Sequence, residues 1–127
     1  FRAFSDAEIA MSAHVLFEAI DPRSAASVSK KIIDIIRNDI KFSGLLISDD
    51  ISMAALPGDI KKRTTNLIEA GNDVILHCNG KLFEMQEIIE SGVAPNTLTL
   101  SRMSSVIEER KKIEHTKIVN LESSQSS

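Results

Sequence analysis

Three short apolar runs, each closed by a polar residue, constrain the fold more than any other feature of this sequence. The runs span residues 9–13, 45–47 and 74–76. Because their apolar residues are consecutive rather than alternating, they are typical of strands buried on both faces of a parallel sheet. The polar residues His14, Asp49 and His77 mark their ends and are 35 and 28 positions apart. A strand, a crossover helix and their loops take about 30 residues, so this spacing predicts repeated βα units.

Amphipathic patterns lie between and after these runs. Apolar residues at spacings of three and four predict helices over residues 27–40, 59–70 and 81–90, and from about residue 101 onward. Asp59 is the expected N-cap of the second helix, and Gly71 its left-handed C-terminal residue. The predicted fold class is therefore α/β with a parallel sheet, whose strand ends gather at one edge. The polar residues 117–127 are expected to form a disordered tail.

The composition limits the class of function. Lys and Arg number 15 against 18 Asp and Glu, so the net charge of −3 gives no reason to expect nucleic acid or a membrane as a partner. No stretch approaches the roughly 18 apolar residues of a membrane span. The one cysteine, Cys78, excludes a disulfide within these residues and fits a reducing compartment, for which the cytoplasm is the default. A chain of 127 residues predicts one domain.

Asp49 and Asp50 are the strongest candidates for chemistry. They follow the second apolar run, at the end of a predicted strand, where α/β proteins gather their functional groups. A carboxylate at this place can act as a nucleophile, act as a base or bind a hard metal ion. The alternative is a solvated acidic loop or an aspartate that caps a helical turn. The residues alone leave these interpretations open.

The three histidines carry weaker signals. His14 could orient a substrate hydroxyl or a carboxylate, although a structural histidine is the favoured interpretation from the residues alone. His77, Cys78 and Asn79 lack the spacing of zinc ligands and are interpreted as polar residues that end a strand. His115 lies in a charged helical pattern with a solvated face. No glycine-rich phosphate loop occurs, and the sequence predicts neither a metal nor a cofactor.

Four strings in this sequence occur in an order that is similar to one enzyme family. They are residues 10–15 (AMSAHV), 19–22 (AIDP), 44–53 (GLLISDDISM) and 70–79 (AGNDVILHCN). Together they resemble the glycoside hydrolase family 3 β-N-acetylhexosaminidases of Gram-negative bacteria, the enzymes of cell-wall recycling, and most of all the alphaproteobacterial members. The resemblance extends from Phe1 to the last predicted helix, and residues 48–53 are its most specific part.

The resemblance implies a fold, an activity and a set of site residues. Residues 1–116 would form the C-terminal portion, about three βα units, of a (β/α)8 barrel. Asp49 would be the nucleophile that attacks the anomeric carbon and forms a glycosyl-enzyme with overall retention of configuration. Asp50 and Met53 would shape the substrate pocket, and His14 would line it. The implied substrate is a terminal N-acetylglucosamine of a muropeptide or other glycoside.

The resemblance also implies residues that this sequence lacks. The acid/base of the family is a histidine in a Lys-His-Phe-Pro-Gly-His-Gly motif, which does not occur here. We therefore expect a retaining β-N-acetylglucosaminidase of which this chain carries the nucleophile but not the acid/base, with the missing N-terminal half of the barrel as a candidate partner. One alternative is a catalytically inactive barrel fragment with a structural role. A receiver-like signalling module is less favoured, because the next strand ends in His77 where a phosphoacceptor aspartate is needed.

Overall fold

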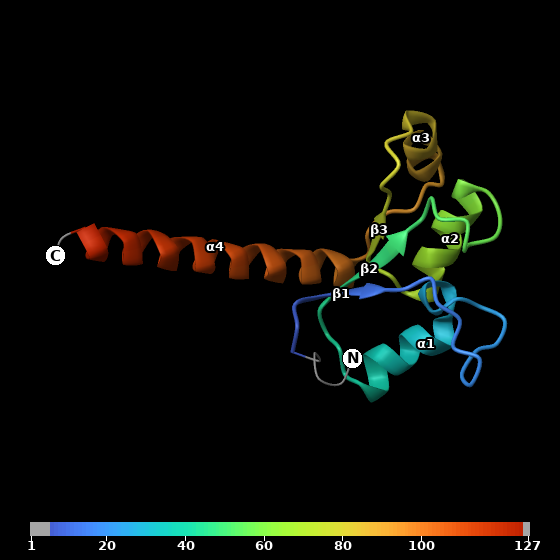
Figure 1. Ribbon diagram of the computed structural model, residues 1–127, viewed down its shortest axis with the longest axis horizontal. Coiled ribbons are helices and arrows are strands. Elements are labelled where there is room, and N and C mark those ends of the chain that lie inside the picture. The colour runs from blue at the N-terminus through green and yellow to red at the C-terminus, as the bar shows by residue number, and fades with distance from the viewer. Residues whose placement is uncertain (1–5, 126–127) are drawn as a thin grey trace.

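The computed structural model describes residues 6–125 and has a parallel sheet of three strands (Figure 1). Strands β1 (Ile9–Ser12), β2 (Leu45–Asp50) and β3 (Val74–Leu76) lie in the order β1-β2-β3, and both pairs are parallel. The predicted α/β class and parallel sheet are confirmed. Residues 1–5 of the predicted domain and residues 126–127 of the predicted tail lie outside the described residues.

Helices alternate with the strands as the spacing predicts. A 3-10 turn (Ala26–Val28), helix α1 (Lys30–Asp34) and a π-helical turn (Ile35–Asp39) connect β1 to β2. Helix α2 (Ile60–Ala70) connects β2 to β3, and helices α3 (Leu82–Glu90) and α4 (Thr97–Gln125) follow β3. The first helix begins at Lys30 rather than near residue 27, because the Ser29 hydroxyl caps it by accepting a hydrogen bond from the Ile32 amide at 3.3 Å.

Both predicted ends of α2 are confirmed. The Oδ1 atom of Asp59 accepts a hydrogen bond from the Lys62 amide at 2.8 Å, as an N-cap does. At the other end Gly71 has a φ of 114°, a conformation that glycine adopts without strain. A side chain at this position would also bring its Cβ to 2.9 Å from the Ile33 side chain. Glycine therefore both ends α2 and lets α1 and α2 approach closely.

The β1–β2 connection, which includes α1, and helix α2 pack against one side of the sheet. Leu46 of β2 is fully buried in a cluster with residues of the β1–β2 connection, of α2 and of the segment before β2: Ala26, Ile32, Ile33, Ile36, Phe42 and Ala70. A second cluster joins the turn after β2 to α2 and consists of Ile51, Leu56 and Leu67. On the other side of β1, Ile9 is 47% exposed and Met11 is 51% exposed. The prediction that this strand is buried on both faces is therefore wrong for the described residues, whose helices leave that side open.

Helix α4 differs most from the sequence-based expectation. It begins at Thr97, before residue 101, because Asn96 Oδ1 accepts a hydrogen bond from the Thr99 amide at 2.9 Å. It then continues to Gln125 and projects away from the rest of the chain, where a disordered tail was expected from residue 117 (Figure 1). In residues 117–125, four residues (Lys117, Leu121, Glu122 and Gln125) are good helix formers, whereas the other five have lower helix propensity.

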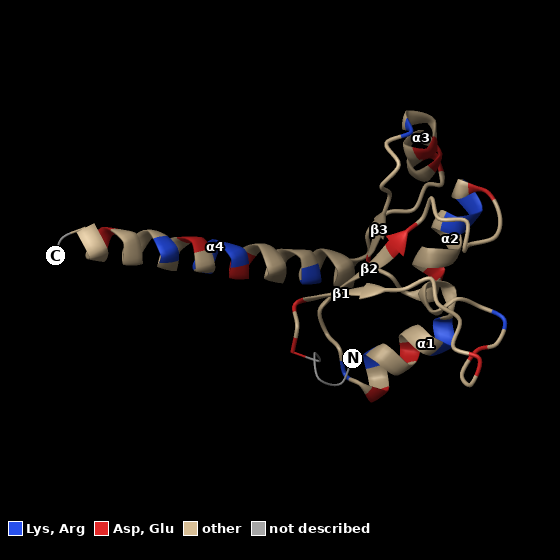
Figure 2. Ribbon diagram, in the orientation of Figure 1, with Lys and Arg blue, Asp and Glu red and all other residues tan. Residues whose placement is uncertain are grey.

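Charges of both signs are distributed along α4 (Figure 2). Two pairs on consecutive positions illustrate this pattern: Lys111 with Glu108 at 3.6 Å and Lys112 with Glu109 at 2.9 Å. Such exposed pairs stabilise a helix by a few tenths of a kcal/mol each. Neither α4 nor any other helix in residues 6–125 combines the length and the apolar character that a bilayer span requires.

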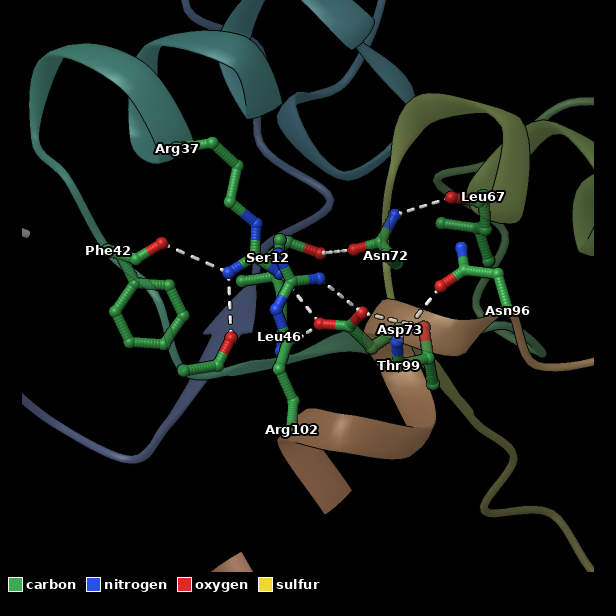
Figure 3. A network of polar contacts seen from close by, with 11 residues as sticks. Ser12, Arg37, Phe42, Leu46, Leu67, Asn72, Asp73, Asn96, Thr99 and Arg102 are labelled. Atoms are coloured by element: carbon green, nitrogen blue, oxygen red, sulfur yellow. Dashed lines mark hydrogen bonds and ion pairs between the residues drawn. The ribbon is translucent and has the colours of Figure 1, made fainter. Parts of the chain in front are cut away.

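A buried aspartate joins the amino-terminal ends of the strands to α4 (Figure 3). Oδ2 of Asp73, the residue before β3, accepts hydrogen bonds from Arg37 Nη2 at 2.6 Å and from the Leu46 amide at 2.9 Å. Its Oδ1 accepts from Thr99 Oγ1 at 2.8 Å and from Arg102 Nη1 at 2.7 Å. Burial raises the pKa of Asp73, but the hydrogen bonds outweigh this effect and hold the pKa below its usual value.

The residue before Asp73 connects the sheet to the helical layer. The Asn72 side chain accepts a hydrogen bond from Ser12 Oγ at 2.5 Å. Its Nδ2 donates to the carbonyl oxygens of Ser27 at 2.6 Å and Leu67 at 2.7 Å. Asn72 is 4% exposed, so these contacts satisfy a buried amide that would otherwise destabilise the fold.

Candidate functional site

The carboxyl end of β2 carries both candidate aspartates. Strand β2 extends through Asp50, so the carboxylates lie within the strand rather than after it. Ile47 pairs with Val74 and Asp50 pairs with Leu76, so three steps along β2 match two steps along β3. This one-residue excess is a β-bulge, a feature that redirects side chains at the ends of strands.

The serine in the bulge stabilises this irregular backbone. Ser48 is fully buried, and its hydroxyl oxygen accepts a hydrogen bond from the Leu76 amide of β3 at 3.2 Å. The same hydroxyl donates to the backbone carbonyl of Asp49 at 2.8 Å. The side chain of Ser48 thus replaces ladder hydrogen bonds that the bulge disrupts, and it fixes the backbone that presents Asp49.

Only one oxygen of the Asp49 carboxylate has a hydrogen-bond partner within residues 6–125. Asp49 lies in the irregular stretch of β2, between Ile47, which pairs with Val74, and Asp50, which pairs with Leu76. Its Oδ1 accepts a hydrogen bond from the Asp50 amide at 2.8 Å. Within residues 6–125, its Oδ2 has no hydrogen-bond partner. The arrangement fixes one oxygen and leaves the other available to a ligand.

Asp50, in contrast, has both oxygens occupied by the protein. Oδ1 accepts from the amides of Ser52 at 3.0 Å and Cys78 at 3.1 Å, and Oδ2 accepts from Ser52 Oγ at 2.6 Å. Burial raises the pKa of Asp50, but these hydrogen bonds outweigh it and keep the pKa below the usual value. Asp50 therefore serves as a fixed anion that joins the turn after β2 to the loop after β3.

His14 contacts the same strand end from the segment after β1. Its Nε2 lies 2.9 Å from the backbone carbonyl oxygen of Asp50, and its Nδ1 lies 2.6 Å from Ser27 Oγ. A carbonyl oxygen only accepts, so Nε2 carries the proton and Nδ1 accepts from the Ser27 hydroxyl. With both ring nitrogens engaged, His14 is suited to hold the backbone of Asp50 in place.

Met53 lies at the edge of this arrangement. It is 43% exposed in the turn after β2, and its amide donates to the Asp50 carbonyl at 3.1 Å. Arg63 Nη1 of α2 donates to the carbonyl oxygens of Ile51 and Met53, both at 3.1 Å. The structure thus connects His14, Asp49 and Asp50 through direct hydrogen bonds and places Met53 on the adjoining turn.

The main cavity in this part of the chain does not contain the two carboxylates. It has a volume of about 650 Å³ and lies between the segment after β1 and α2; residues from both line it, among them His14, Arg23, Lys30, Asn66 and Glu69. Asp49, Asp50 and Met53 are not among its lining residues. Of the predicted site residues, His14 alone borders this cavity.

Glu84 of α3 is buried near this site, although no pattern in the sequence predicts its burial. Its Oε2 accepts hydrogen bonds from Asn79 Nδ2 at 2.7 Å and from His77 Nε2 at 2.9 Å, and Lys81 Nζ lies 3.4 Å from Oε1. The hydrogen bonds from His77 and Asn79 lower the pKa of Glu84 below its usual value. A glutamate in a predicted surface helix gives no signal of burial. One signal in the sequence could have indicated a buried acceptor here: His77 and Asn79, two side chains with donor groups, lie two positions apart.

The loop after β3 does not provide a metal site among the described residues. His77 Nδ1 is buried and has no hydrogen-bond partner within residues 6–125, and Cys78 is a free, exposed cysteine. No group of three or more His, Cys, Asp or Glu side chains in the same range is arranged to hold an ion. His77 and Asn79 are polar residues after the strand, as interpreted from the sequence, and both side chains form hydrogen bonds with Glu84.

Comparison with known proteins connects this geometry to a family. Residues 1–109 match the model of the glycosyl hydrolase family 3 N terminal domain. A beta-hexosaminidase of Idiomarina loihiensis is 32% identical over 112 residues, which cover 80% of this chain and 34% of that protein. A beta-hexosaminidase of Nitrosomonas eutropha is 40% identical over 83 residues, covering 62% of this chain and 24% of that protein.

Solved structures give the same result. NagZ from Neisseria gonorrhoeae superposes with a TM-score of 0.64 at 31% identity, covering 83% of this chain and 31% of that one. A β-N-acetylhexosaminidase from Beutenbergia cavernae has a TM-score of 0.64 at 28% identity, covering 70% of this chain and 28% of that one. The chain spans about a third or less of the length of these relatives. Because the family model covers most of its residues, this chain belongs to glycosyl hydrolase family 3.

Proposed function

We propose that this chain supplies the nucleophile of a retaining β-N-acetylglucosaminidase, and that Asp49 is that nucleophile. The half-engaged carboxylate of Asp49 is the observation that carries this proposal. Its Oδ1 is held by the Asp50 amide, while Oδ2 has no partner within residues 6–125. A nucleophilic carboxylate needs one oxygen free to attack the anomeric carbon and a fixed orientation for that attack.

The hydrogen bonds of Asp50 argue against it in this role. Both of its oxygens accept hydrogen bonds from Ser52 or Cys78, so either oxygen would have to share its lone pairs with, or release, a protein donor in order to attack. Asp50 instead orients its neighbour, because its amide is the donor to Asp49 Oδ1. Asp50, His14 and Met53 are proposed to shape the substrate pocket around Asp49.

Trapping the covalent intermediate tests the assignment. In the complete gene product that carries these residues, a fluorosugar inactivator slows the hydrolysis of the glycosyl-enzyme and leaves the sugar on the nucleophile. We expect fragmentation of the labelled peptide to place the sugar on Asp49. Asp49→Asn should abolish labelling, and the matched variant Asp50→Asn should retain it. Labelling that survives in Asp49→Asn and disappears in Asp50→Asn would overturn the assignment.

We further propose that these residues form the C-terminal portion of a (β/α)8 barrel over residues 1–116. Three parallel strands leave two sheet edges, and the apolar side of β1 is open, with Ile9 and Met11 about half exposed. Further strands would cover both features. Expressed alone, residues 1–127 should self-associate and show no turnover of a chromogenic N-acetylglucosaminide, because the general acid of such enzymes contributes about 10²–10⁴-fold. A monomer that turns over substrate in an Asp49-dependent way would contradict this proposal.

For the natural substrate we propose a muropeptide with a terminal N-acetylglucosamine, in the cytoplasm. The motif resemblance to cell-wall recycling enzymes supports the substrate, and the single free Cys78 is compatible with a reducing compartment. The proposed partner is the remainder of the barrel. Hydrolysis of purified muropeptides, compared with hydrolysis of chitobiose by the same preparation, measures the substrate preference directly.

A further inference from the structure

The loop after β3 is held by two other elements, α3 and β2. The side chains of His77 and Asn79 both bind Oε2 of Glu84 on α3. Between them, the amide of Cys78 donates to Oδ1 of Asp50 on β2 at 3.1 Å. Three consecutive residues therefore link a buried glutamate to the end of the strand that carries Asp49.

We propose that Glu84 is a positioning residue: by holding His77 and Asn79 it places the Cys78 amide on Asp50, and thereby the Asp50 amide on Asp49. This inference rests on the proposed role of Asp49. Within residues 6–125, no hydrogen bond joins Glu84 to Asp49 or Asp50, so its effect passes through the backbone of residues 77–79.

The burial of Glu84 makes this link rigid. The residue is 8% exposed, although charged side chains are almost always solvated. Its carboxylate accepts hydrogen bonds from two side chains and lies near the Lys81 ammonium. The Lys81 amide in turn donates to Asn79 Oδ1 at 3.0 Å, so both ends of the Asn79 amide group are fixed. Loss of Glu84 would leave the donors of His77 and Asn79 without their shared acceptor, and the loop would lose its anchor.

The link continues through Asp50 to the candidate nucleophile. Asp50 Oδ1 accepts hydrogen bonds from the Ser52 amide in the turn after β2 and from the Cys78 amide in the loop after β3. If the Cys78 amide withdraws, only the local contacts with Ser52 hold the carboxylate. The backbone of Asp50 also accepts from His14 and donates to Asp49, so its position sets the direction of the Asp49 carboxylate.

The test uses the complete gene product with cysteine labelled at its nitrogen. Cys78 is exposed, and its amide signal is identified as the one that disappears in Cys78→Ser. In Glu84→Leu we expect the Cys78 amide to exchange with solvent about tenfold faster, the effect of losing roughly one net hydrogen bond. Glu84→Gln should stay within about twofold of the wild type, because a carboxamide oxygen can accept the same two donors. Glu90→Leu, at an exposed position of the same helix, is the matched control and should leave the exchange unchanged.

A milder variant keeps the test informative if Glu84→Leu does not fold. Asn79→Ala removes one of the two donors to Glu84, and it should accelerate exchange of the Cys78 amide by a smaller factor than Glu84→Leu. The pKa of the Asp50 carboxyl, followed by carbon NMR, should move up toward its usual value in Asn79→Ala, because the Cys78 hydrogen bond helps to lower it and this variant keeps the charge of Glu84. Folded variants with unchanged Cys78 exchange and unchanged Asp50 titration would overturn the proposal.

Kinetics separate this inference from the proposed function. If Asp49 is the nucleophile, Glu84→Leu should lower kcat about tenfold with little change in KM, because the loss concerns the direction of the carboxylate rather than sugar binding. A wild-type protein that never labels on Asp49, together with faster Cys78 exchange in Glu84→Leu, would refute the nucleophile and support the link. Labelling on Asp49 without any response of Cys78 or kcat to Glu84→Leu would refute the link alone.

Discussion

At the amino-terminal end of β3, Asp73 has four hydrogen bonds, two arginine partners and a side chain that is 2% exposed. At the carboxyl end of β2, Asp49 has one hydrogen bond within residues 6–125, and its Oδ2 has no partner there. Both are aspartates at strand ends, but the protein supplies four hydrogen-bond donors to the carboxylate of Asp73 and one to that of Asp49. In parallel α/β folds the amino-terminal edge typically serves stability and the carboxyl edge serves function. The contrast between these two aspartates agrees with that division.

The largest expected effect comes from Asp49. Asp49→Asn should lower kcat about 10⁴-fold, because an amide cannot form the covalent intermediate. The free energy of unfolding should change by less than about 0.5 kcal/mol, since the side chain is partly exposed and makes one hydrogen bond. Single-turnover kinetics and urea unfolding of the same preparation measure the two quantities. A large loss of stability without loss of activity would show that Asp49 has the structural role that we assign to Asp73.

Asp73 should show the opposite pattern. Asp73→Asn removes the charge that neutralises Arg37 and Arg102, and leaving buried ionic groups unpaired costs about 3 kcal/mol. The free energy of unfolding should fall by this amount, while kcat per folded molecule stays close to that of the wild type. The matched control is Asp34→Asn, whose exposed pair with Lys30 contributes less than about 1 kcal/mol. Equal losses in the two variants would refute a special role for the Asp73 network.

His14→Ala should have an intermediate effect. Removing the ring frees the Asp50 carbonyl and the Ser27 hydroxyl, and kcat/KM should fall about tenfold, the equivalent of roughly one net hydrogen bond. Azide should not restore the rate, because anion rescue is a property of a missing acid/base. His115→Ala, at an exposed position of α4, provides the control. Rescue by azide would show that His14 is the acid/base instead.

The smallest expected effect concerns pH. The pKa of Asp50 is lowered in the folded state, so its charge adds stability above the unfolded pKa of about 3.9, and this contribution disappears as the pH falls through the folded value. The difference in the free energy of unfolding between wild type and Asp50→Asn should therefore be larger at about pH 6 than at about pH 2. Urea titrations at the two pH values measure it. A difference that does not vary with pH would mean that the folded structure does not perturb this carboxyl.

Local features of the fold were predictable because their causes are local. The N-cap at Asp59 and the C-terminal glycine at Gly71 follow from residue types within one turn of α2. The parallel sheet followed from the spacing of three apolar runs, which a crossover helix requires. The position of Asp49 at a strand end was also predictable. Its half-engaged carboxylate was not, because that depends on which backbone amide the neighbouring bulge directs toward it.

Features that depend on distant partners were not predictable. Asp73 accepts hydrogen bonds from three other segments: from Arg37, from Leu46 and from the start of α4. No pattern in the residues next to Asp73 predicts these contacts. The burial of Glu84 likewise depends on how α3 turns toward the loop after β3. The open side of β1 was mispredicted because consecutive apolar residues indicate a buried strand whether or not the covering elements are among the residues described.

The bulge in β2 limits how this strand end can be redesigned. Three steps of β2 match two steps of β3, so a one-residue deletion between Ile47 and Asp50 would give regular pairing and change the hydrogen bonds of both aspartates. Substitutions of Asp49 or Asp50 keep the chain length and leave the paired positions in place. Point substitutions are therefore the cleaner way to separate the roles of the two carboxylates.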